Sequence, residues 1–225
     1  MGLKTPLIIV NFKTYESATG RNAEQLAKIC EKVAKQTKSN IAVAVQDADI
    51  YRVSHTVKIP VLSEHMDPIG YGAHTGQVLP EDIKANGAKG SLLNHSEDRF
   101  EIDDLEKSVK IAKKLNLTTI ICASSDDVSE SVAAFNPDFI AVEPPELIGG
   151  DISVSTAKPQ IITQTVKKVN KIAKIPILCG AGIKTREDVE KAVSLGAKGI
   201  LIASAITKSS NPGAALKDLA LGFSK

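Results

Sequence analysis

Eight short apolar runs recur along the whole chain, and this recurrence constrains the fold more than any other feature. Each run is nearly continuous and rich in β-branched residues, which is typical of parallel strands buried on both faces. Segments with helical periodicity lie between the runs. The predicted strands are Leu7–Val10, Ile41–Val45, Val61–Ser63, Ser91–Leu93, Thr118–Ala123, Phe139–Val142, Ile177–Cys179 and Gly199–Ala203.

The intervening segments also carry the signals of helix faces and helix ends. Apolar stripes are predicted at Leu26, Ile29, Cys30 and Val33, and at Ile162, Thr165, Val166, Val169 and Ile172. Left-handed C-caps are predicted at Asn86-Gly87, Asn116 and Leu195-Gly196. Thr185, with Asp188 three residues later, resembles a capping box that opens a helix.

This alternation predicts an α/β fold, a single (β/α)8 barrel that occupies residues 1–225 as one domain. The chain is 43% hydrophobic, which is enough to bury a full core at this length. An open doubly wound sheet is the competing interpretation, but no G-x-G-x-x-G sequence follows the first strand. In a barrel, functional residues stand at the C-terminal ends of the strands.

Composition excludes several classes of partner. The formal net charge is +2, Trp is absent, and no basic run carries interleaved aromatics, so nucleic-acid binding is not expected. Cys30, Cys122 and Cys179 are widely spaced in apolar stretches, as reduced core cysteines of a cytosolic protein would be. Without a signal-like or membrane-spanning run, we expect a soluble cytoplasmic protein that binds no membrane. No Cys/His spacing suggests a metal site.

The sixth predicted strand ends in a carboxylate, Glu143, followed by an unusual loop. Pro144 and Pro145 fix their φ angles, whereas Gly149 and Gly150 leave the far side free, so the loop is built like a hinged flap. A carboxylate beside such a flap suits an acid/base step that is shielded from water. A surface Glu before an ordinary proline turn is the alternative.

Two other strand ends carry candidate catalytic residues. The first strand ends Asn11-Phe12-Lys13, where a lysine leaving a buried strand is costly unless it faces a polar site. The fourth ends Asn94-His95-Ser96-Glu97, and we expect Ser96 to cap a short helix whose N-terminus keeps His95 neutral. A solvated lysine in the first loop is the alternative for Lys13.

Small residues follow the last two strands, in Cys179-Gly180-Ala181-Gly182-Ile183 and in Leu201-Ile202-Ala203-Ser204-Ala205. They allow a ligand to approach backbone N–H groups, and helix N-termini come next, which favours phosphate over a simple tight turn. Many phosphate-binding barrels share this half, so it indicates a class of substrate and not a reaction.

Together, Asn11-Phe12-Lys13, Asn94-His95-Ser96-Glu97 and the loop from Glu143 to Gly150 resemble the triosephosphate isomerase family over nearly the whole chain. The short length, the Glu143–Gly150 loop and Cys179-Gly180-Ala181-Gly182 resemble the archaeal branch most. The resemblance implies the TIM barrel fold and the interconversion of D-glyceraldehyde 3-phosphate and dihydroxyacetone phosphate in glycolysis and gluconeogenesis. It implies neither metal nor organic cofactor.

The resemblance also assigns roles by position. Glu143 matches the base, His95 the electrophile, and Lys13 the cation that holds substrate. The family is a general example of a glutamate base paired with a neutral histidine. Glu97 and Ser96 match supporting positions. The matched substrate-binding residues are Asn11, Phe12, Lys13, Ile148, Gly149, Gly182, Ala203 and Ser204.

Departures and alternatives accompany this match. The chain has Glu146 where many relatives carry Trp, Gly182 where they carry Ser, and Ala203-Ser204 in place of a Gly pair. A sugar-phosphate epimerase, a Trp-pathway barrel or a non-catalytic phosphate-binding protein would share the phosphate half. The polar loop 70–77, which includes Thr75, resembles the loop that enters a neighbouring subunit, so we expect at least a dimer and, from the archaeal resemblance, a tetramer.

Overall fold

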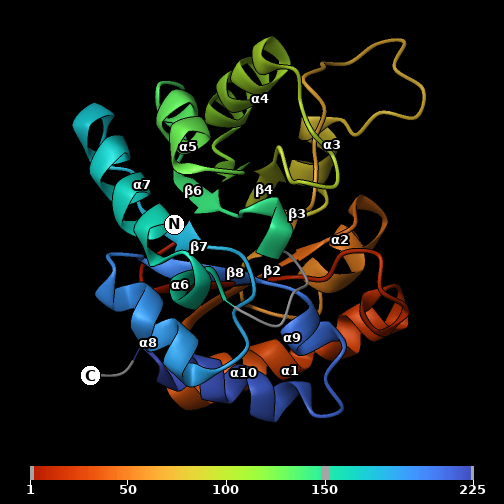
Figure 1. Ribbon diagram of the computed structural model, residues 1–225. Coiled ribbons are helices and arrows are strands. Elements are labelled where there is room, and N and C mark those ends of the chain that lie inside the picture. The colour runs from red at the N-terminus through yellow and green to blue at the C-terminus, as the bar shows by residue number, and fades with distance from the viewer. Residues whose placement is uncertain (1–2, 148–152, 224–225) are drawn as a thin grey trace.

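Eight parallel strands form a closed barrel in chain order in the computed structural model, which describes residues 3–147 and 153–223 (Figure 1). Each strand pairs with the next, and β1 pairs with β8 to complete the ring. The strands are β1 (Leu7–Asn11), β2 (Asn40–Val45), β3 (Val61–Ser63), β4 (Gly90–Leu93), β5 (Thr118–Ala123), β6 (Phe139–Val142), β7 (Ile177–Cys179) and β8 (Gly199–Ile202).

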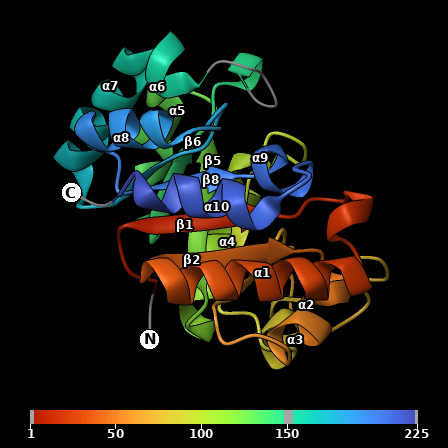
Figure 2. The same cartoon turned by 90° about the horizontal axis from the view of Figure 1, so that it is seen from below.

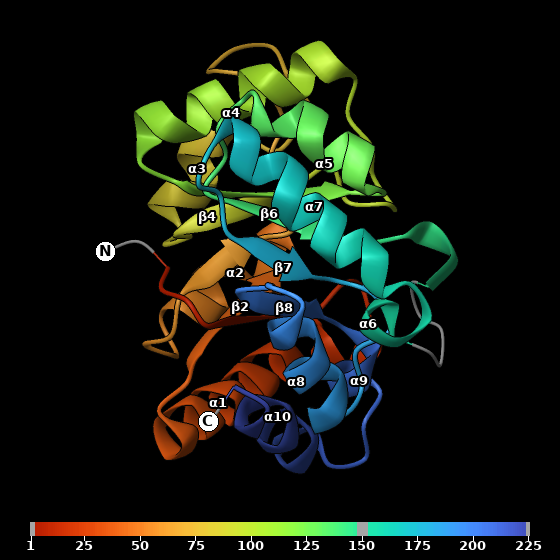
Figure 3. The same ribbon diagram turned by 60° about the vertical axis from the view of Figure 1, so that its left-hand side comes forward.

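Helices surround the ring, with α1 and α10 side by side on its outside (Figure 2) and α7 and α8 covering β7 and β8 (Figure 3). The described helices are α1 (Arg21–Thr37), α2 (Asp47–Ser54), α3 (Pro80–Ala85), α4 (Ile102–Leu115), α5 (Asp126–Ala133), α6 (Val154–Ala157), α7 (Pro159–Ile172), α8 (Arg186–Ser194), α9 (Ser204–Thr207) and α10 (Pro212–Leu221), with 3-10 turns η1 (Glu16–Ala18) and η2 (Pro145–Leu147). No helix among the described residues is both long and apolar enough to cross a membrane.

The strand predictions are confirmed to within one residue at each end. They succeed because alternate side chains of each strand enter two different apolar layers, so the whole run is apolar. Leu7 and Ile9 belong to the cluster that fills the barrel, whereas Ile8 and Val10 belong to the larger cluster between the strands and the helices. The predicted fold class, a (β/α)8 barrel, is therefore confirmed.

The seam of the barrel, where β1 meets β8, requires a glycine. Leu7 lies opposite Gly199 in the parallel register. A Cβ atom at position 199 would lie 2.2 Å from the carbonyl oxygen of Leu7 and 2.8 Å from Leu178 Cδ2. Because neither the backbone oxygen nor the packed interior can retreat cheaply, only glycine fits this register.

The predicted helix ends are also confirmed. Asn116 takes a left-handed φ of 56°, and Gly87 and Gly196 have φ of 101° and 104°. Thr185 and Asp188 form both hydrogen bonds of the capping box that opens α8. One helix-face prediction is wrong: Ile172 is 47% exposed, because it stands at the last position of α7, beyond the part of the helix that packs on the barrel.

The connection between β3 and α3 projects away from the barrel (Figure 1). Residues 71–77 are all exposed, and Tyr71 is 81% exposed. Exposure of a large aromatic side chain to water is unfavourable in proportion to the apolar area that remains exposed.

Candidate active site

A cavity opens at the C-terminal ends of the strands, and seven of the predicted site residues line it: Asn11, Lys13, His95, Glu143, Gly182, Ala203 and Ser204. These residues come from five strand ends, which the closed barrel brings to one mouth. Ile148 and Gly149 lie outside the described residues. The cavity is also lined by residues of the two segments that favoured phosphate, Gly180, Ile183, Leu201, Ile202 and Ala205, and by Tyr15 and Lys184, which the sequence analysis did not single out.

Glu143 follows β6 directly and is 4% exposed. Its backbone N–H donates to the carbonyl of Ala123 at 2.8 Å, so the sheet pairing continues one residue past the strand and fixes where the side chain starts. Among the described residues, the Oε2 atom of Glu143 has no hydrogen-bond partner. A buried carboxylate oxygen without a donor is costly when charged, which favours its protonated form.

Burial raises the pKa of the Glu143 carboxyl to about 7, and a hydrogen bond with the Cys122 thiol and the charge of Lys13 act in the opposite direction. A carboxyl with this pKa is a much better base than an ordinary Glu near neutral pH. Cys122 lies on β5, next to β6, and its thiol is buried beneath the carboxylate. It does not line the cavity wall, so no strand-end rule could identify it.

Gly180 leaves the room that the Glu143 side chain occupies. A Cβ atom at position 180 would lie 2.3 Å from Glu143 Cγ and 2.8 Å from its Oε1. The N–H of Gly180 donates to the Val142 carbonyl at 3.0 Å, so the residue is also held in place by β6. Its position directly after β7 was the signal in the sequence that it stands at the cavity mouth.

His95 follows β4 and is 8% exposed. The Glu97 N–H donates to its Nδ1 at 3.2 Å. An accepting Nδ1 carries no proton, so the neutral ring holds its proton on Nε2, which lies 3.9 Å from Glu143 Oε2. The proton-bearing nitrogen of the imidazole and the carboxylate therefore face one another in the cavity.

The imidazole is neutral for a different reason from the one predicted. Ser96 opens no helix: residues 96–97 form a turn, in which the Asp98 N–H donates to the His95 carbonyl at 2.9 Å, and the next helix, α4, begins at Ile102. Burial, followed by the positive charge of Lys13, lowers the pKa of His95 to about 4. The expected neutral state is thus kept by desolvation and a nearby cation, not by a helix dipole.

Lys13 adopts a left-handed conformation with φ of 49°. The Asn11 side chain accepts from its backbone N–H at 3.0 Å and so holds the turn that aims the lysine at the cavity. Its ammonium donates to Glu97 Oε1 at 2.7 Å, where the lysine side chain is 13% exposed and the glutamate 59%. Because Glu97 is so exposed, this ion pair orients the lysine more than it stabilises the fold.

Phe12 is placed differently from its neighbours. Its side chain is fully buried in the apolar layer between strands and helices, and it does not line the cavity. Phe12 therefore anchors the chain between Asn11 and Lys13, and any contact with a ligand is left to the residues on either side.

Glu64 is a second buried carboxyl beside this site that the sequence reading missed, although it follows β3 directly. Its Oε1 atom is buried and has no hydrogen-bond partner within residues 3–147 and 153–223. Burial raises its pKa to about 8, against a hydrogen bond from the Lys13 backbone. The strand-end rule would have found it had the third strand been read in the same way as the first.

The opposite wall of the cavity is built from backbone. Gly182 takes a φ of 69°, and Ala203 and Ser204 stand at the start of α9. Within the described part of the chain, the N–H groups of Gly182 and Ser204 donate no hydrogen bond. Unused N–H donors beside a lysine form a suitable surface for an anion. No cluster of three His, Cys, Asp or Glu side chains that could hold a metal ion occurs among the described residues.

Comparison with known proteins gives one consistent result. The family model described as Triosephosphate isomerase matches residues 6–219. The chain is 48% identical to the triosephosphate isomerase of Methanobacterium bryantii, over 96% of each chain. It is 47% identical to that of Methanothermus fervidus, over 95% of this chain and 97% of the relative. It is 46% identical to that of Methanosarcina barkeri, over 97% of this chain and 98% of the relative.

Proposed function

Since the chain belongs to the triosephosphate isomerase family, we propose that Glu143 is the base, His95 the electrophile and Lys13 the substrate-holding cation of its reaction. The enzyme interconverts D-glyceraldehyde 3-phosphate and dihydroxyacetone phosphate. This aldose–ketose isomerisation moves one proton between adjacent carbons and shifts the carbonyl, with an enediolate between the two sugars. It needs a base and an oxyanion stabiliser on the two sides of the substrate.

The observation that carries the assignment is that a carboxyl with a raised pKa, Glu143, and an imidazole with a lowered pKa, His95, lie 3.9 Å apart between Oε2 and Nε2. Glu143, with a pKa of about 7, removes the proton next to the carbonyl. His95, with a pKa of about 4, is neutral, and its Nε2–H donates to the carbonyl oxygen as negative charge develops there. A neutral imidazole is closer in acidity to the enediol than an imidazolium is, so it can return the proton to either oxygen.

We assign the phosphate of the substrate to the backbone wall of the cavity. Gly182, Ala203 and Ser204 supply N–H groups and the Lys13 ammonium supplies charge, with Ile148 and Gly149 contributing from the loop after Glu143. Small side chains suffice because the donors are backbone groups, which fits Gly182 in place of the usual serine. Asn11 and Phe12 hold the lysine turn.

Glu97 and Ser96 have supporting roles in this scheme. Glu97 contacts both Lys13 and His95. Its carboxylate accepts from Lys13 Nζ at 2.7 Å, and its backbone N–H donates to His95 Nδ1 at 3.2 Å. Ser96 joins His95 to Glu97 in the turn that makes the second contact. The pair therefore orients the imidazole and the ammonium relative to one another.

We further propose a cytoplasmic homo-oligomer, at least a dimer and, by its archaeal relatives, a tetramer. The exposed loop 70–77, which includes the exposed Tyr71, is suited to enter a neighbouring subunit beside Asn11 and Glu97, with Thr75 in contact. That contact would hold the catalytic turn from behind. The location is supported by three buried cysteines that form no disulfide.

A single substitution tests the catalytic assignment. Glu143→Gln removes the base and keeps the size of the side chain, so we expect kcat to fall by roughly three orders of magnitude or more while a phosphate-bearing inhibitor still binds. The matched control is Glu187→Gln, an exposed change on α8. The assay couples dihydroxyacetone phosphate formation to its reduction.

The pH profile gives a second readout. In the wild-type enzyme, kcat/KM should fall with a midpoint near pH 7 as Glu143 takes up a proton. Near wild-type kcat in Glu143→Gln, or a kcat/KM that is flat from pH 5 to 8, would remove Glu143 from the role of base.

A further inference from the structure

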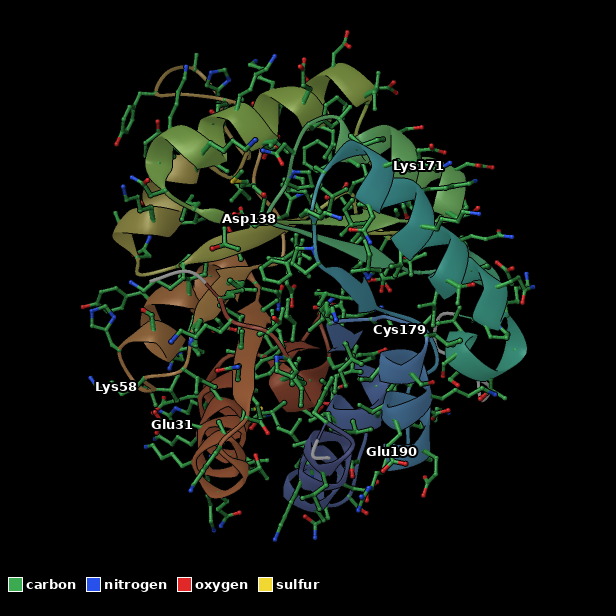
Figure 4. The ribbon with its side chains drawn as sticks, turned by 90° about the vertical axis from the view of Figure 1, so that its left-hand side faces the viewer. Glu31, Lys58, Asp138, Lys171, Cys179 and Glu190 are labelled. Atoms are coloured by element: carbon green, nitrogen blue, oxygen red, sulfur yellow. The ribbon has the colours of Figure 1, made fainter. Side chains whose placement is uncertain are left out.

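The loop 180–185 carries Gly180, Gly182, Ile183 and Lys184 to the cavity, and one carboxylate holds its last two residues. Asp188, near the start of α8, accepts from the Lys184 N–H at 3.0 Å and from the Thr185 N–H at 3.1 Å, both at Oδ2. The loop begins after Cys179, the last residue of β7, which Figure 4 labels. Glu190, also labelled in Figure 4, lies on α8 and is exposed. Asp188 itself lies outside the cavity lining.

The other oxygen of Asp188 holds a segment from elsewhere in the sequence. The Ser153 hydroxyl donates to Asp188 Oδ1 at 2.5 Å, across 35 positions of sequence. The Ser155 hydroxyl lies 3.0 Å from Ser153 Oγ and 3.2 Å from the Asp188 carbonyl oxygen. The side chains of Ser153 and Ser155 are buried, at 2% and 0% exposure. A hydrogen bond to a carboxylate is among the stronger polar contacts in a protein.

A backbone contact joins the same two segments directly. The Val154 N–H, at the start of α6, donates to the Ala181 carbonyl at 3.0 Å. Figures 1 and 3 show α6 next to α8, and the two helices are in contact. The loop 180–185 is therefore held at Ala181 by α6 and at Lys184 and Thr185 by Asp188, which leaves Gly182 between two fixed points.

A helix cap alone does not require this arrangement. The capping box of α8 is complete with Thr185 and Asp188, whose side chains each accept from the other's backbone. Ser153 adds nothing to the cap, yet it places a buried hydroxyl on the carboxylate that orients the peptide groups of Lys184 and Thr185. Those peptide groups follow directly on Gly182 and Ile183, whose N–H groups face no acceptor within the described part of the chain.

From this geometry we propose that Asp188 is a positioning residue for the isomerase reaction, which it serves by clamping the loop 180–185 to Ser153 so that the Gly182 N–H stays aimed at the substrate phosphate. The proposal rests on the proposed phosphate site. Asp188 does not line the cavity, and its carboxylate accepts from the Lys184 and Thr185 N–H groups and from the Ser153 hydroxyl. Preorganised donors bind an anion more tightly than donors that must first be ordered.

The test compares variants that break different parts of the clamp. Ser153→Ala removes the hydroxyl link and keeps the cap, Asp188→Asn weakens both, and Ser153→Thr restores a hydroxyl. Thr185→Ala is the matched control, since it damages the cap but keeps the Ser153 link and both backbone donors to Asp188. Affinity for inorganic phosphate is measured by calorimetry, and kcat and KM are measured in the coupled assay.

We expect Ser153→Ala and Asp188→Asn to weaken phosphate binding and raise KM by about five- to tenfold. The value of kcat should stay within about twofold of the wild type, because the phosphate is bound equally in the ground state and in the transition state and both lose the same binding energy. Ser153→Thr should restore affinity. Thr185→Ala should lower the thermal midpoint with phosphate affinity unchanged.

Two results would overturn the proposal: wild-type phosphate affinity in Ser153→Ala, or an equal loss of affinity in Thr185→Ala, which would assign the effect to the cap. Because phosphate binding is measured without turnover, a wild-type protein that binds phosphate but does not isomerise the triose phosphates would contradict the proposed function and leave this test intact. If Asp188→Asn does not fold, Ser153→Ala alone decides.

Discussion

Replacing Gly180 with alanine should damage catalysis through one added methyl group. The new Cβ would lie 2.3 Å from Glu143 Cγ and 2.9 Å from its Cδ. Carbon atoms in contact are about 3.5–4.0 Å apart, so the side chain must retreat by at least about 1 Å. Position 180 does not have a left-handed φ, so alanine introduces no backbone strain and the effect is confined to this contact.

The magnitude follows from the contacts of Glu143, which lies against Gly180 and is hydrogen-bonded to the buried Cys122 thiol, so a retreat from position 180 displaces its carboxylate. A displacement of about 1 Å in a catalytic group costs about 100-fold in rate, so kcat should fall by about that factor. Overpacking of a filled site costs about 1–3 kcal/mol. For a domain of this length, each kcal/mol corresponds to roughly 2–4 °C in the thermal midpoint.

The assay is kcat at saturating substrate, measured at least ten degrees below the thermal midpoint so that unfolded enzyme does not contribute. The control is Gly213→Ala in α10, where the added Cβ would meet Ile29 Cγ2 at an acceptable 3.4 Å. That variant should keep kcat and gain slightly in stability, since alanine favours a helix. A kcat within about threefold of wild type in Gly180→Ala would refute the idea that this glycine makes room for the base.

Three further outcomes are expected. The His95 ring, whose pKa burial and Lys13 lower to about 4, should show no NMR titration between pH 8 and 5; a midpoint near 6.5 would mean that the imidazole is not desolvated. Glu64→Gln should raise the thermal midpoint at pH 9 and leave it nearly unchanged at pH 4. The carboxyl has a pKa of about 8 when folded and about 4.3 when unfolded, so its contribution to stability is present at low pH and is lost as pH rises through this window; an equal gain at both pH values would contradict this linkage. Thr75→Arg, which places a charged side chain in the exposed loop, should shift the oligomer toward a monomer of the 23.8 kDa chain and lower activity, as light scattering and the coupled assay will show; full activity in a monomer would refute the proposed subunit contact.

The fold was predictable from the sequence because its signal is repeated. The strands β1 to β8 are buried almost throughout, so each appears as a nearly continuous apolar run, and the caps at Asn116 and Thr185 mark helix ends independently of those runs. Ile172 was misplaced because a periodic stripe does not say where a helix leaves the core.

The candidate site was predictable where it depends on strand ends and not where it depends on packing. Glu143, His95 and Lys13 each follow a strand in sequence, and all three line the cavity. Ser96 looked like a helix cap because serine after a strand has the same appearance before a helix and before a turn. Cys122 and Gly180 act on Glu143 from neighbouring strands, and such contacts exist only after the barrel closes.

The pairing of β1 with β8 makes the order of synthesis matter to this protein. β1 is synthesised before β8 and must wait for it, because Leu7 pairs with Asn40 of β2 on one side but finds its partner on the other side only at Gly199. Until then both strands at the opening offer unpaired N–H and C=O groups, which can recruit another nascent chain. Contacts this distant in sequence also form late and slowly. Gly199, which allows the barrel to close, therefore also affects how long the newly synthesised chain is prone to aggregation. Its replacement should reduce the yield of soluble enzyme more than the specific activity of the molecules that fold.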